Sequence, residues 1–222
     1  MSTVAEPDRQ LSLPELTVAD LAARFGKLPD HRIRRQPLAG TATEADVIVL
    51  NERDNCLCEL IDGILVEKTM GLYESNLAHL LGRILGAFLA ERNLGTIFGP
   101  DGMMRLWPGR IRLPDVSYVS WRRLGGALER REAALDGGPD LAVEIISPDN
   151  TREEMQEKLK DYFLANVQQV WYVYPKQREV HVHTAPDAVR VLCAGDALEG
   201  GSLLPGFVLP IDQLFDAQGP GS

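Results

Sequence analysis

The sequence predicts an α/β fold in which a mixed central β-sheet is flanked by helices, with additional strands toward both ends of the chain. Two segments have strong helical periodicity, and short apolar runs with strand character alternate with them. No linker or low-complexity stretch divides the 222 residues, and 45% of them are hydrophobic. This composition is usual for a globular protein with a core.

The first 50 residues give mixed signals and are followed by a clear hairpin pattern. Residues 17–28, TVADLAARFGKL, predict a short helix, and residues 29–46 are rich in turn formers. Residues 58–67, CELIDGILVE, contain two apolar runs on either side of Asp62-Gly63. Because this dipeptide favours a type I′ turn, we expect an antiparallel hairpin here.

Residues 74–92, ESNLAHLLGRILGAFLAER, predict a long amphipathic helix. Apolar side chains recur at i, i+3, i+4, i+7 and i+8 from Leu77 onward. Helical angles place Glu74 on this apolar stripe in the first turn and His79 on the opposite face. We therefore expect Glu74 to point at the sheet and His79 to be a solvated surface histidine.

The rest of the chain predicts strands and one more helix. The strand-like segments lie near residues 95–99, 102–107, 111–120, 141–146, 169–174, 179–183 and 189–193. A charged loop is expected at 121–140. Thr151 followed by Glu154 is a capping-box pattern, which predicts a helix that begins there and ends near residue 165.

The charge of the chain limits its partners. The net charge is −9 and the pI is near 5.0, so the molecule as a whole should repel nucleic acid and anionic membranes. A polyanionic substrate would need a local basic patch. The arginine-rich stretches at 31–35 and 121–132 are candidates for such a patch, and solvated charged loops are the equally weighted alternative.

The cysteines and histidines carry little information about chemistry. Cys56, Cys58 and Cys193 are too few and too odd in number for a disulfide framework, which indicates a reducing compartment. The pairs Cys56-x-Cys58 and His181-x-His183 invite a zinc interpretation, but they are far apart in sequence and lack the usual finger spacing. With no signal peptide or membrane span evident, we expect a cytoplasmic protein.

Two strand segments each carry one carboxylate in an apolar context. Alternation along IRLPDVSYV places Asp115 on one face with Ile111 and Leu113, and Glu144 interrupts the apolar run LAVEII. A buried unpaired carboxylate costs several kcal/mol, so Glu144 should have a partner or a metal. Two carboxylates from neighbouring strands offer the hard oxygen ligands of a Mg²⁺ site, with positions left for water and phosphate.

A lysine on the second helix completes this pattern. Lys158 lies at the edge of the apolar arc, about 40° from Tyr162, whereas Lys160 points outward. We expect Lys158 to reach back over the sheet with its stem packed and its ammonium group free. With Asp115 and Glu144 it predicts a phosphodiester-cleaving site: the carboxylates hold a divalent cation, and the lysine orients water and offsets developing charge.

Several ordered motifs extend this pattern along the chain. They are CELIDGILVEK, ESNLAHLL, PDVSYVSW, DLAVEIISPDN, EKLKDYFLANVQQVWYVYP and LPGFVLPIDQLF. In this order they resemble the Uma-type restriction endonuclease family of the PD-(D/E)XK nuclease superfamily, over roughly residues 40 to 216. The resemblance implies a restriction endonuclease-like αβββαβ core, Mg²⁺ or Mn²⁺ as cofactor and DNA as substrate.

The resemblance also assigns roles to particular residues. The superfamily places an aspartate on the second core strand, and on the third an acid followed two residues later by lysine. Asp115 matches the first position and Glu144 the second, but residue 146 is isoleucine, which departs from the pattern. Family members place the lysine on the next helix, and Lys158 matches that place.

Further positions complete the predicted site. Glu74 matches the first-helix acid of many superfamily members, with a role toward water or a second metal, and Glu59 matches a recurrent family position. The predicted catalytic residues are Asp115, Glu144, Lys158 and Glu74, and the predicted metal ligands are Asp115, Glu144, Ile145 and Glu59.

Each side chain in this site also has a structural alternative. Asp115 could close a turn by accepting backbone hydrogen bonds, and Glu144 could form a buried ion pair with an arginine. Lys158 could be a solvated lysine on the helix surface. Glu74 could interact with the dipole of its own helix, and Glu59 could pair across the hairpin.

The sequence thus predicts a nuclease domain at residues 41–216, preceded by an extension at 1–40 and followed by a disordered tail at 217–222. The predicted function is a metal-dependent endonuclease that acts on DNA, with a homodimer as a further expectation. The alternative is a catalytically inactive protein that keeps the nuclease fold for binding or scaffolding. The isoleucine at 146 and the acidic charge support this alternative, and a hydrolase acting on another substrate is a third interpretation.

Overall fold

The structure is a computed structural model, which describes residues 16–54, 56–126 and 133–216. The predicted tail at 217–222 and the first 15 residues of the predicted extension lie outside the described residues. The described part contains these helices: α1 (Val18–Phe25), α2 (Glu44–Asp54), α3 (Leu72–Arg92), α4 (Trp121–Leu124), α5 (Arg152–Leu164), α6 (Ile211–Asp216) and the 3-10 turn η1 (Asp30–Arg32).

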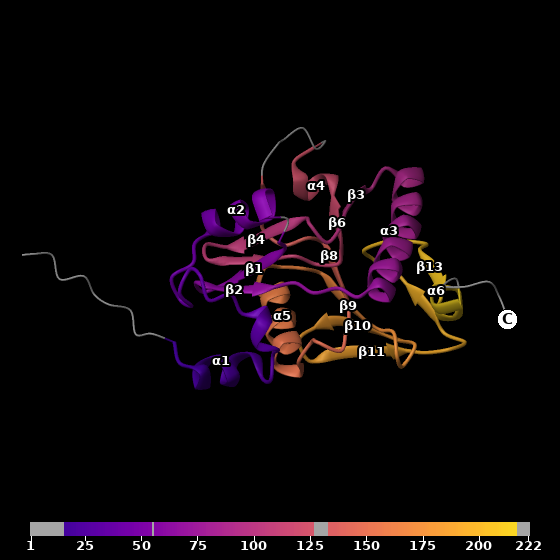
Figure 1. The fold of residues 1–222 in the computed structure, drawn as a ribbon. Helices are drawn as coiled ribbons and strands as arrows, with labels where there is room; N and C mark the ends of the chain where they lie inside the picture. The colour runs from indigo at the N-terminus through magenta and orange to yellow at the C-terminus, as the bar shows by residue number, and fades with distance from the viewer. Residues whose placement is uncertain (1–15, 55, 127–132, 217–222) are drawn as a thin grey trace, which may run out of the picture.

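The strands form two larger sheets and one small one (Figure 1). The first sheet has, in spatial order, β2 (Ile64–Glu67), β1 (Cys58–Ile61), β5 (Arg110–Arg112), β4 (Met103–Trp107) and β7 (Ala134–Asp136). The second sheet has β11 (Ala188–Leu192), β10 (Glu179–Ala185), β9 (Gln169–Tyr174), β8 (Leu141–Ile145), β6 (Val116–Ser120) and β3 (Gly95–Phe98). The small sheet pairs β12 (Ala197–Glu199) with β13 (Val208–Pro210).

The second sheet contains the predicted core. Along the chain its elements follow in the order α3, β3, β6, β8, α5 and β9, which is the αβββαβ succession. β8 and β9 are parallel and the other pairs in this sheet are antiparallel. The prediction of an α/β fold with a mixed sheet is therefore confirmed.

Two helices cover opposite faces of the second sheet. The apolar face of α3 packs on Val116, Val143 and Ile145, whereas α5 packs with Ala142 and Tyr172. Side chains alternate between the two faces of a strand, so even-numbered residues of β8 face α5. α5 also contacts residues of the first sheet, and in Figure 1 it lies beside both sheets.

Local sequence signals are formed as expected. Asp62 and Gly63 have φ values of 50° and 79°, and two positive values are what a type I′ turn requires. The capping box of Thr151 and Glu154 is present at the start of α5. Both features depend on neighbouring residues alone, which explains why the sequence reveals them.

The predicted strand at 111–120 is wrong as a single element. β5 ends at Arg112 in the first sheet and β6 begins at Val116 in the second, so the chain changes sheets across residues 113–115. Pro114 lies at this crossing, and proline cannot donate a backbone hydrogen bond to a sheet. Leu113 packs in the apolar cluster under α2, so Asp115 does not share its surroundings, contrary to the alternation argument.

Two other segments have more regular structure than predicted. Residues 121–140 contain α4 and β7 rather than only a charged loop, and residues 127–132 of that stretch lie outside the described residues. α2 occupies part of the first 50 residues, where no helix was predicted beyond residue 28. It packs Val47 and Leu50 against the first sheet, and this tertiary burial stabilises a segment with weak amphipathic periodicity. In the described part of the chain, no helix has the length and apolar character needed to cross a membrane.

The hairpin turn gives a test of the fold. Gly63 has a positive φ, and a Cβ there would overlap the backbone carbonyl of Gly40. Gly109 has the same φ of 79° but no atom within 4 Å of an added Cβ. Gly109→Ala therefore measures the backbone strain at positive φ without a steric overlap. We expect Gly109→Ala to lower the free energy of unfolding by about 1 kcal/mol and Gly63→Ala by at least about 2 kcal/mol. Urea denaturation measures both, and equal losses would contradict the predicted backbone contact.

Candidate active site

Asp115 and Glu144 lie opposite each other at the junction of β6 and β8. The two strands are antiparallel with Val116 opposite Val143, and one further step in this register pairs Asp115 with Glu144. Opposite residues of such a pair share one face of the sheet. That face is the one covered by α5, so both carboxylates point toward this helix.

Asp115 is held between a backbone amide and a lysine. Its Oδ2 accepts a hydrogen bond from the backbone N–H of Ile145 at 2.6 Å, and its Oδ1 lies 2.7 Å from the Nζ of Lys68. Lys68 also donates to the backbone carbonyl of Leu113. The alternative in which Asp115 closes a turn is not what the structure shows, because the amide it accepts from belongs to the neighbouring strand β8.

Glu144 is bound by Lys158 and Tyr162 from α5. The Nζ of Lys158 lies 3.1 Å from each carboxylate oxygen, and the hydroxyl of Tyr162 donates to Oε1 at 2.5 Å. Burial raises the pKa of Glu144; Lys158 opposes this rise and the nearby charge of Asp115 adds to it. The structural alternative for Glu144 was an ion pair with an arginine. Its partners are instead Lys158 and, one helical turn later, Tyr162.

Lys158 is a buried bridge rather than a lysine with a free ammonium group. Besides Glu144, its Nζ contacts Oε1 of Glu59 at 2.9 Å, so three acceptors surround the three ammonium protons. The solvated alternative is also wrong, because the side chain is only 4% exposed. Burying an ammonium group without counter-charges has a large desolvation cost. This cost explains why carboxylate oxygens surround the Nζ of Lys158.

Glu59 continues the network into the first sheet. Its Oε2 accepts from Arg112 at 2.8 Å, and its Oε1 also accepts the backbone N–H of Leu113 at 3.1 Å. Burial alone would raise the pKa of Glu59, but Lys158 and Arg112 lower it to about 2. Arg112, which is fully buried, reaches on to Asp161 of α5 at 2.5 Å. Glu59 therefore pairs with a neighbouring strand and with α5, not across its own hairpin.

The donor chemistry of this cluster fits a divalent cation. Asp115 and Glu144 are two ionisable oxygen donors on one face, and Mg²⁺ and Mn²⁺ prefer such ligands. In this structure lysine ammonium groups stand at both carboxylates and balance their charge. Asp115 and Glu144 are the residues that could hold such a metal, and it would take over part of that balancing charge.

The remaining predicted positions lie apart from this cluster. Glu74 is half-buried in the first turn of α3, which covers the other face of the second sheet. No hydrogen bond or ion pair joins it to Asp115 or Glu144, both of which are described. His79 is exposed, as its place on the helix predicts. Ile146, at the superfamily lysine position, is partly buried in the apolar cluster under α5.

Lys68 and Arg112 are the partners that sequence reasoning missed. Lys68 ends the motif CELIDGILVEK but has no periodic pattern of its own. Arg112 and Arg110 do give a signal, because they alternate with apolar residues in a short strand and therefore share one face. Two arginines on a buried face require carboxylate partners, but the sequence does not say which ones.

The zinc interpretation finds only partial support. Within the described ranges, Cys56, Cys58 and Glu67 place one ligand atom each within 4.8 Å of one another. Arg34 already contacts the carboxylate of Glu67 at 2.5 Å, and a guanidinium there opposes a cation. His181 is not part of this group and lies against Glu179.

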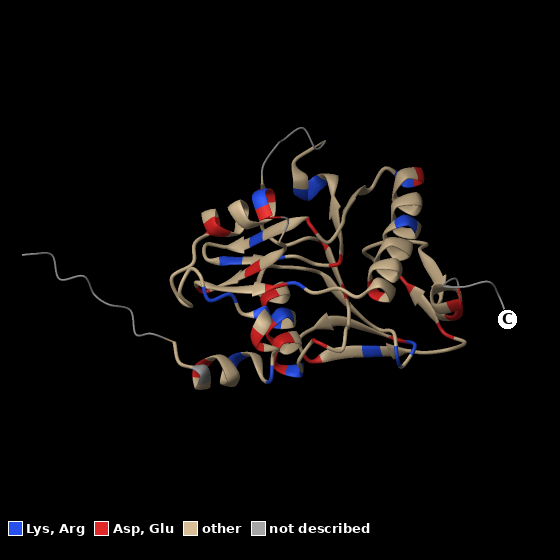
Figure 2. Ribbon diagram, in the orientation of Figure 1, with Lys and Arg blue, Asp and Glu red and all other residues tan. Residues whose placement is uncertain are grey.

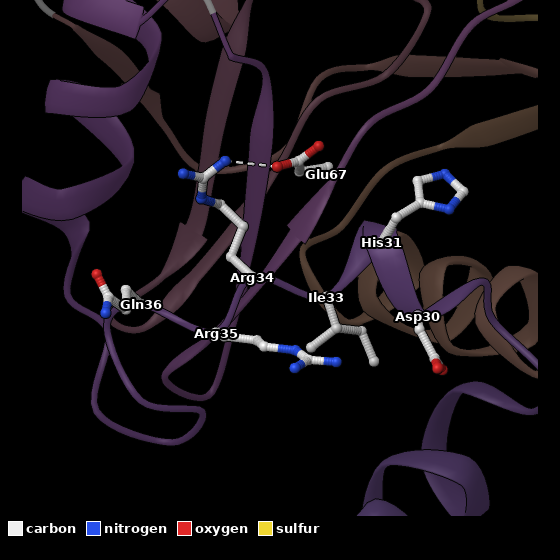
Figure 3. A pocket seen from close by; sticks show the side chains of 7 residues that line it. All are labelled: Asp30, His31, Ile33, Arg34, Arg35, Gln36 and Glu67. Atoms are coloured by element: carbon white, nitrogen blue, oxygen red, sulfur yellow. Dashed lines mark hydrogen bonds and ion pairs between the residues drawn. The ribbon is translucent and has the colours of Figure 1, made fainter.

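The basic stretch at 31–35 borders an open pocket. This cavity of about 520 Å³ lies beside the end of β2 and is lined by Asp30, His31, Ile33, Arg34, Arg35, Gln36 and Glu67 (Figure 3). Arg34 points at Glu67, whereas Arg35 points away from it. Arg35 forms no hydrogen bond or ion pair with any described residue, so its charge is open to a ligand.

Comparisons with known proteins agree with this architecture. Residues 45–212 match the model of the Uma2 family, described as "Putative restriction endonuclease". No curated protein matches the chain. The solved structures that match include the crystal structure of a putative nuclease belonging to DUF820 from Anabaena variabilis ATCC 29413. It shares 19% identity with a TM-score of 0.64, covering 72% of this chain and 89% of that one, and shows a common fold.

The buried position of Arg112 gives a test of the charge network. Arg112→Met leaves Glu59 and Asp161 buried with one counter-charge fewer, and such losses cost about 3–5 kcal/mol. The control is Arg178→Met, because Arg178 pairs with Asp216 on the surface and is 45% exposed, so about 0–1 kcal/mol is expected. Urea denaturation compares the two, and equal losses would contradict a buried network.

Proposed function

Because the chain belongs to the Uma2 family, we propose that it is a metal-dependent endonuclease that hydrolyses phosphodiester bonds in DNA. The family match spans most of the chain and bears out the resemblance seen in its motifs. The observation that carries the proposal further is the placement of Asp115 opposite Glu144, on one face, with ammonium groups at both. A phosphate-cleaving site requires positive charge close to the phosphate, and a pair of acids can hold such cations in place.

The two acids would bind the metal in this proposal. A bound Mg²⁺ or Mn²⁺ supplies a Lewis acid for the phosphate and a more acidic water. The protein's part is to fix the acids: the backbone N–H of Ile145 orients Asp115, and Lys158 with Tyr162 orients Glu144. Lys158 is thereby a positioning residue, since its ammonium group is surrounded by carboxylate oxygens of Glu144 and Glu59.

DNA as substrate rests on charge placement. The chain is acidic overall, so a polyanion must meet local positive charge. His31, Arg34 and Arg35 line the open pocket at the end of β2 together with Asp30 and Glu67 (Figure 3). In Figure 2 blue and red residues gather around α5 and the first sheet, while much of α3 is uncharged. Around this pocket Arg34 is balanced by Glu67, so the guanidinium group of Arg35, unpaired among the described residues, is the positive charge that supports a phosphodiester ligand here.

An inactive scaffold is the competing function. Ile146 in place of a lysine supports it, as does the complete pairing of both acids. However, Lys158 contacts Glu144 rather than pointing away from it, and the contacts keep four carboxylates inside the protein at a high desolvation cost.

Plasmid cleavage tests the proposal. The protein is incubated with supercoiled DNA and Mg²⁺ or Mn²⁺, and conversion to nicked or linear DNA is followed on gels. We expect EDTA to abolish cleavage, and Glu144→Gln or Asp115→Asn to lower its rate by at least about 100-fold, because each removes charge that would hold the metal.

The matched control is His79→Ala, since His79 is exposed on the helix that covers the other face of the sheet. This variant should cleave at the wild-type rate. Cleavage that persists in Glu144→Gln at full rate would come from another site or a contaminant. Absence of cleavage in the wild type, together with no Mn²⁺ binding by calorimetry, would favour the scaffold.

A further inference from the structure

Two buried lysines contact the acid pair, and they differ in the number of acceptor oxygens around the ammonium group. Lys158 has three carboxylate acceptors for its three protons. Lys68 has two acceptors, the Oδ1 of Asp115 and the carbonyl of Leu113, among the described residues. The Lys68 ammonium group therefore has one nearby acceptor fewer than that of Lys158, and at least one of its three protons has no acceptor among the described residues.

The two lysines also differ in what holds their backbones. Lys158 lies in the middle of α5, whereas Lys68 lies in the irregular link between β2 and α3. Thr69, the next residue in this link, has a buried hydroxyl with no hydrogen-bond partner among the residues described. Buried hydroxyl groups are rarely left unpaired, so next to Lys68 the link has a polar group without a partner among the described residues.

Charge counting gives Lys68 a role in the loaded site. With all groups ionised, the cluster has four carboxylates, Glu59, Asp115, Glu144 and Asp161, and three cations, Lys68, Arg112 and Lys158. Arg110 also contacts Asp161, but Arg110 and Arg24 are balanced by Asp62 and Glu157 and add no net charge. The net charge of the cluster is −1. A divalent cation would make it +1, and one phosphodiester would bring it to zero. Without the charge of Lys68 the loaded site would keep an excess negative charge, which opposes a phosphate.

We propose that Lys68, and not Lys158, is the lysine that contacts the scissile phosphate, and that its ammonium group occupies the cation position at Asp115 until a divalent ion replaces it. This inference rests on the proposed function. Lys68 moves from Asp115 to a phosphate oxygen. There its charge offsets the negative charge that grows as the water oxygen bonds to phosphorus and the bond from phosphorus to the leaving sugar oxygen breaks. Lys158 stays with Glu144 and Glu59.

Two measurements on Lys68→Met test this proposal. Binding of Mn²⁺ alone, measured by calorimetry, should tighten by about threefold or more, because a competing positive charge has been removed. Cleavage of supercoiled DNA at saturating Mn²⁺ should fall by about 100-fold. Lys68→Arg should recover part of the cleavage. Lys160→Met, an exposed change on α5, should alter neither quantity.

A structural role for Lys68 would give a different result. If Lys68 merely stabilised Asp115, its loss would weaken Mn²⁺ binding, and this outcome overturns the proposal. Cleavage within threefold of wild type by Lys68→Met would also overturn it. If the wild type itself fails to cleave DNA, the proposed function and the phosphate contact both fall, whereas tighter Mn²⁺ binding by Lys68→Met still supports the displacement.

A measurement on the wild-type protein covers the case in which Lys68→Met does not fold. The rate at which an amine-reactive reagent modifies Lys68 is followed by mass spectrometry with and without Mn²⁺. Adding Mn²⁺ should release the ammonium group of Lys68 from Asp115, so the modification rate of Lys68 should rise severalfold. The modification rates of Lys160 and Lys158 should stay unchanged. An unchanged rate at Lys68 in protein that binds Mn²⁺ would overturn the proposal.

Discussion

The structure depends on one buried cluster of ion pairs, in which the carboxylates of Glu59, Asp115, Glu144 and Asp161 meet the cations of Lys68, Arg112 and Lys158. Each charged group there is a large desolvation cost unless opposite charges surround it, so the elements that carry them must meet in one arrangement. Glu59 and Arg112 come from the first sheet, Glu144 from the second, and Lys158 from α5. Ion pairing between them joins the two sheets through α5, where apolar packing alone would allow other placements.

The same constraint explains why the acid pair is closed off by lysines. Asp115 and Glu144 face each other, and their mutual repulsion adds to the burial that raises the pKa of Glu144. Lys68 and Lys158 relieve that repulsion, since one ammonium group lies against each carboxylate. The protein's own cations therefore stabilise the acid pair inside the fold.

Sequence reasoning succeeded where neighbours in the chain decide the structure. The periodicity of α3, the Asp62-Gly63 turn and the Thr151 cap all depend on residues within a few positions. The αβββαβ succession followed from these signals and from the resemblance. Reasoning failed at Pro114, where the chain changes sheets, since alternation assumes one continuous strand. It also missed Lys68 and Arg112, because an ion pair between residues about 50 positions apart leaves no local pattern.

Ile146 indicates how this chain can do without a lysine on its third core strand. Its side chain fills the apolar cluster under α5, so a lysine there would lose packing and would have to share the acids with Lys158. The cations come instead from α5 and from the link after β2. Because that link and Glu59 belong to the hairpin of the first sheet, the site extends beyond the αβββαβ core. The first sheet must therefore pack in place for the charges of the site to balance. The hairpin of β1 and β2 belongs to the site together with β6 and β8.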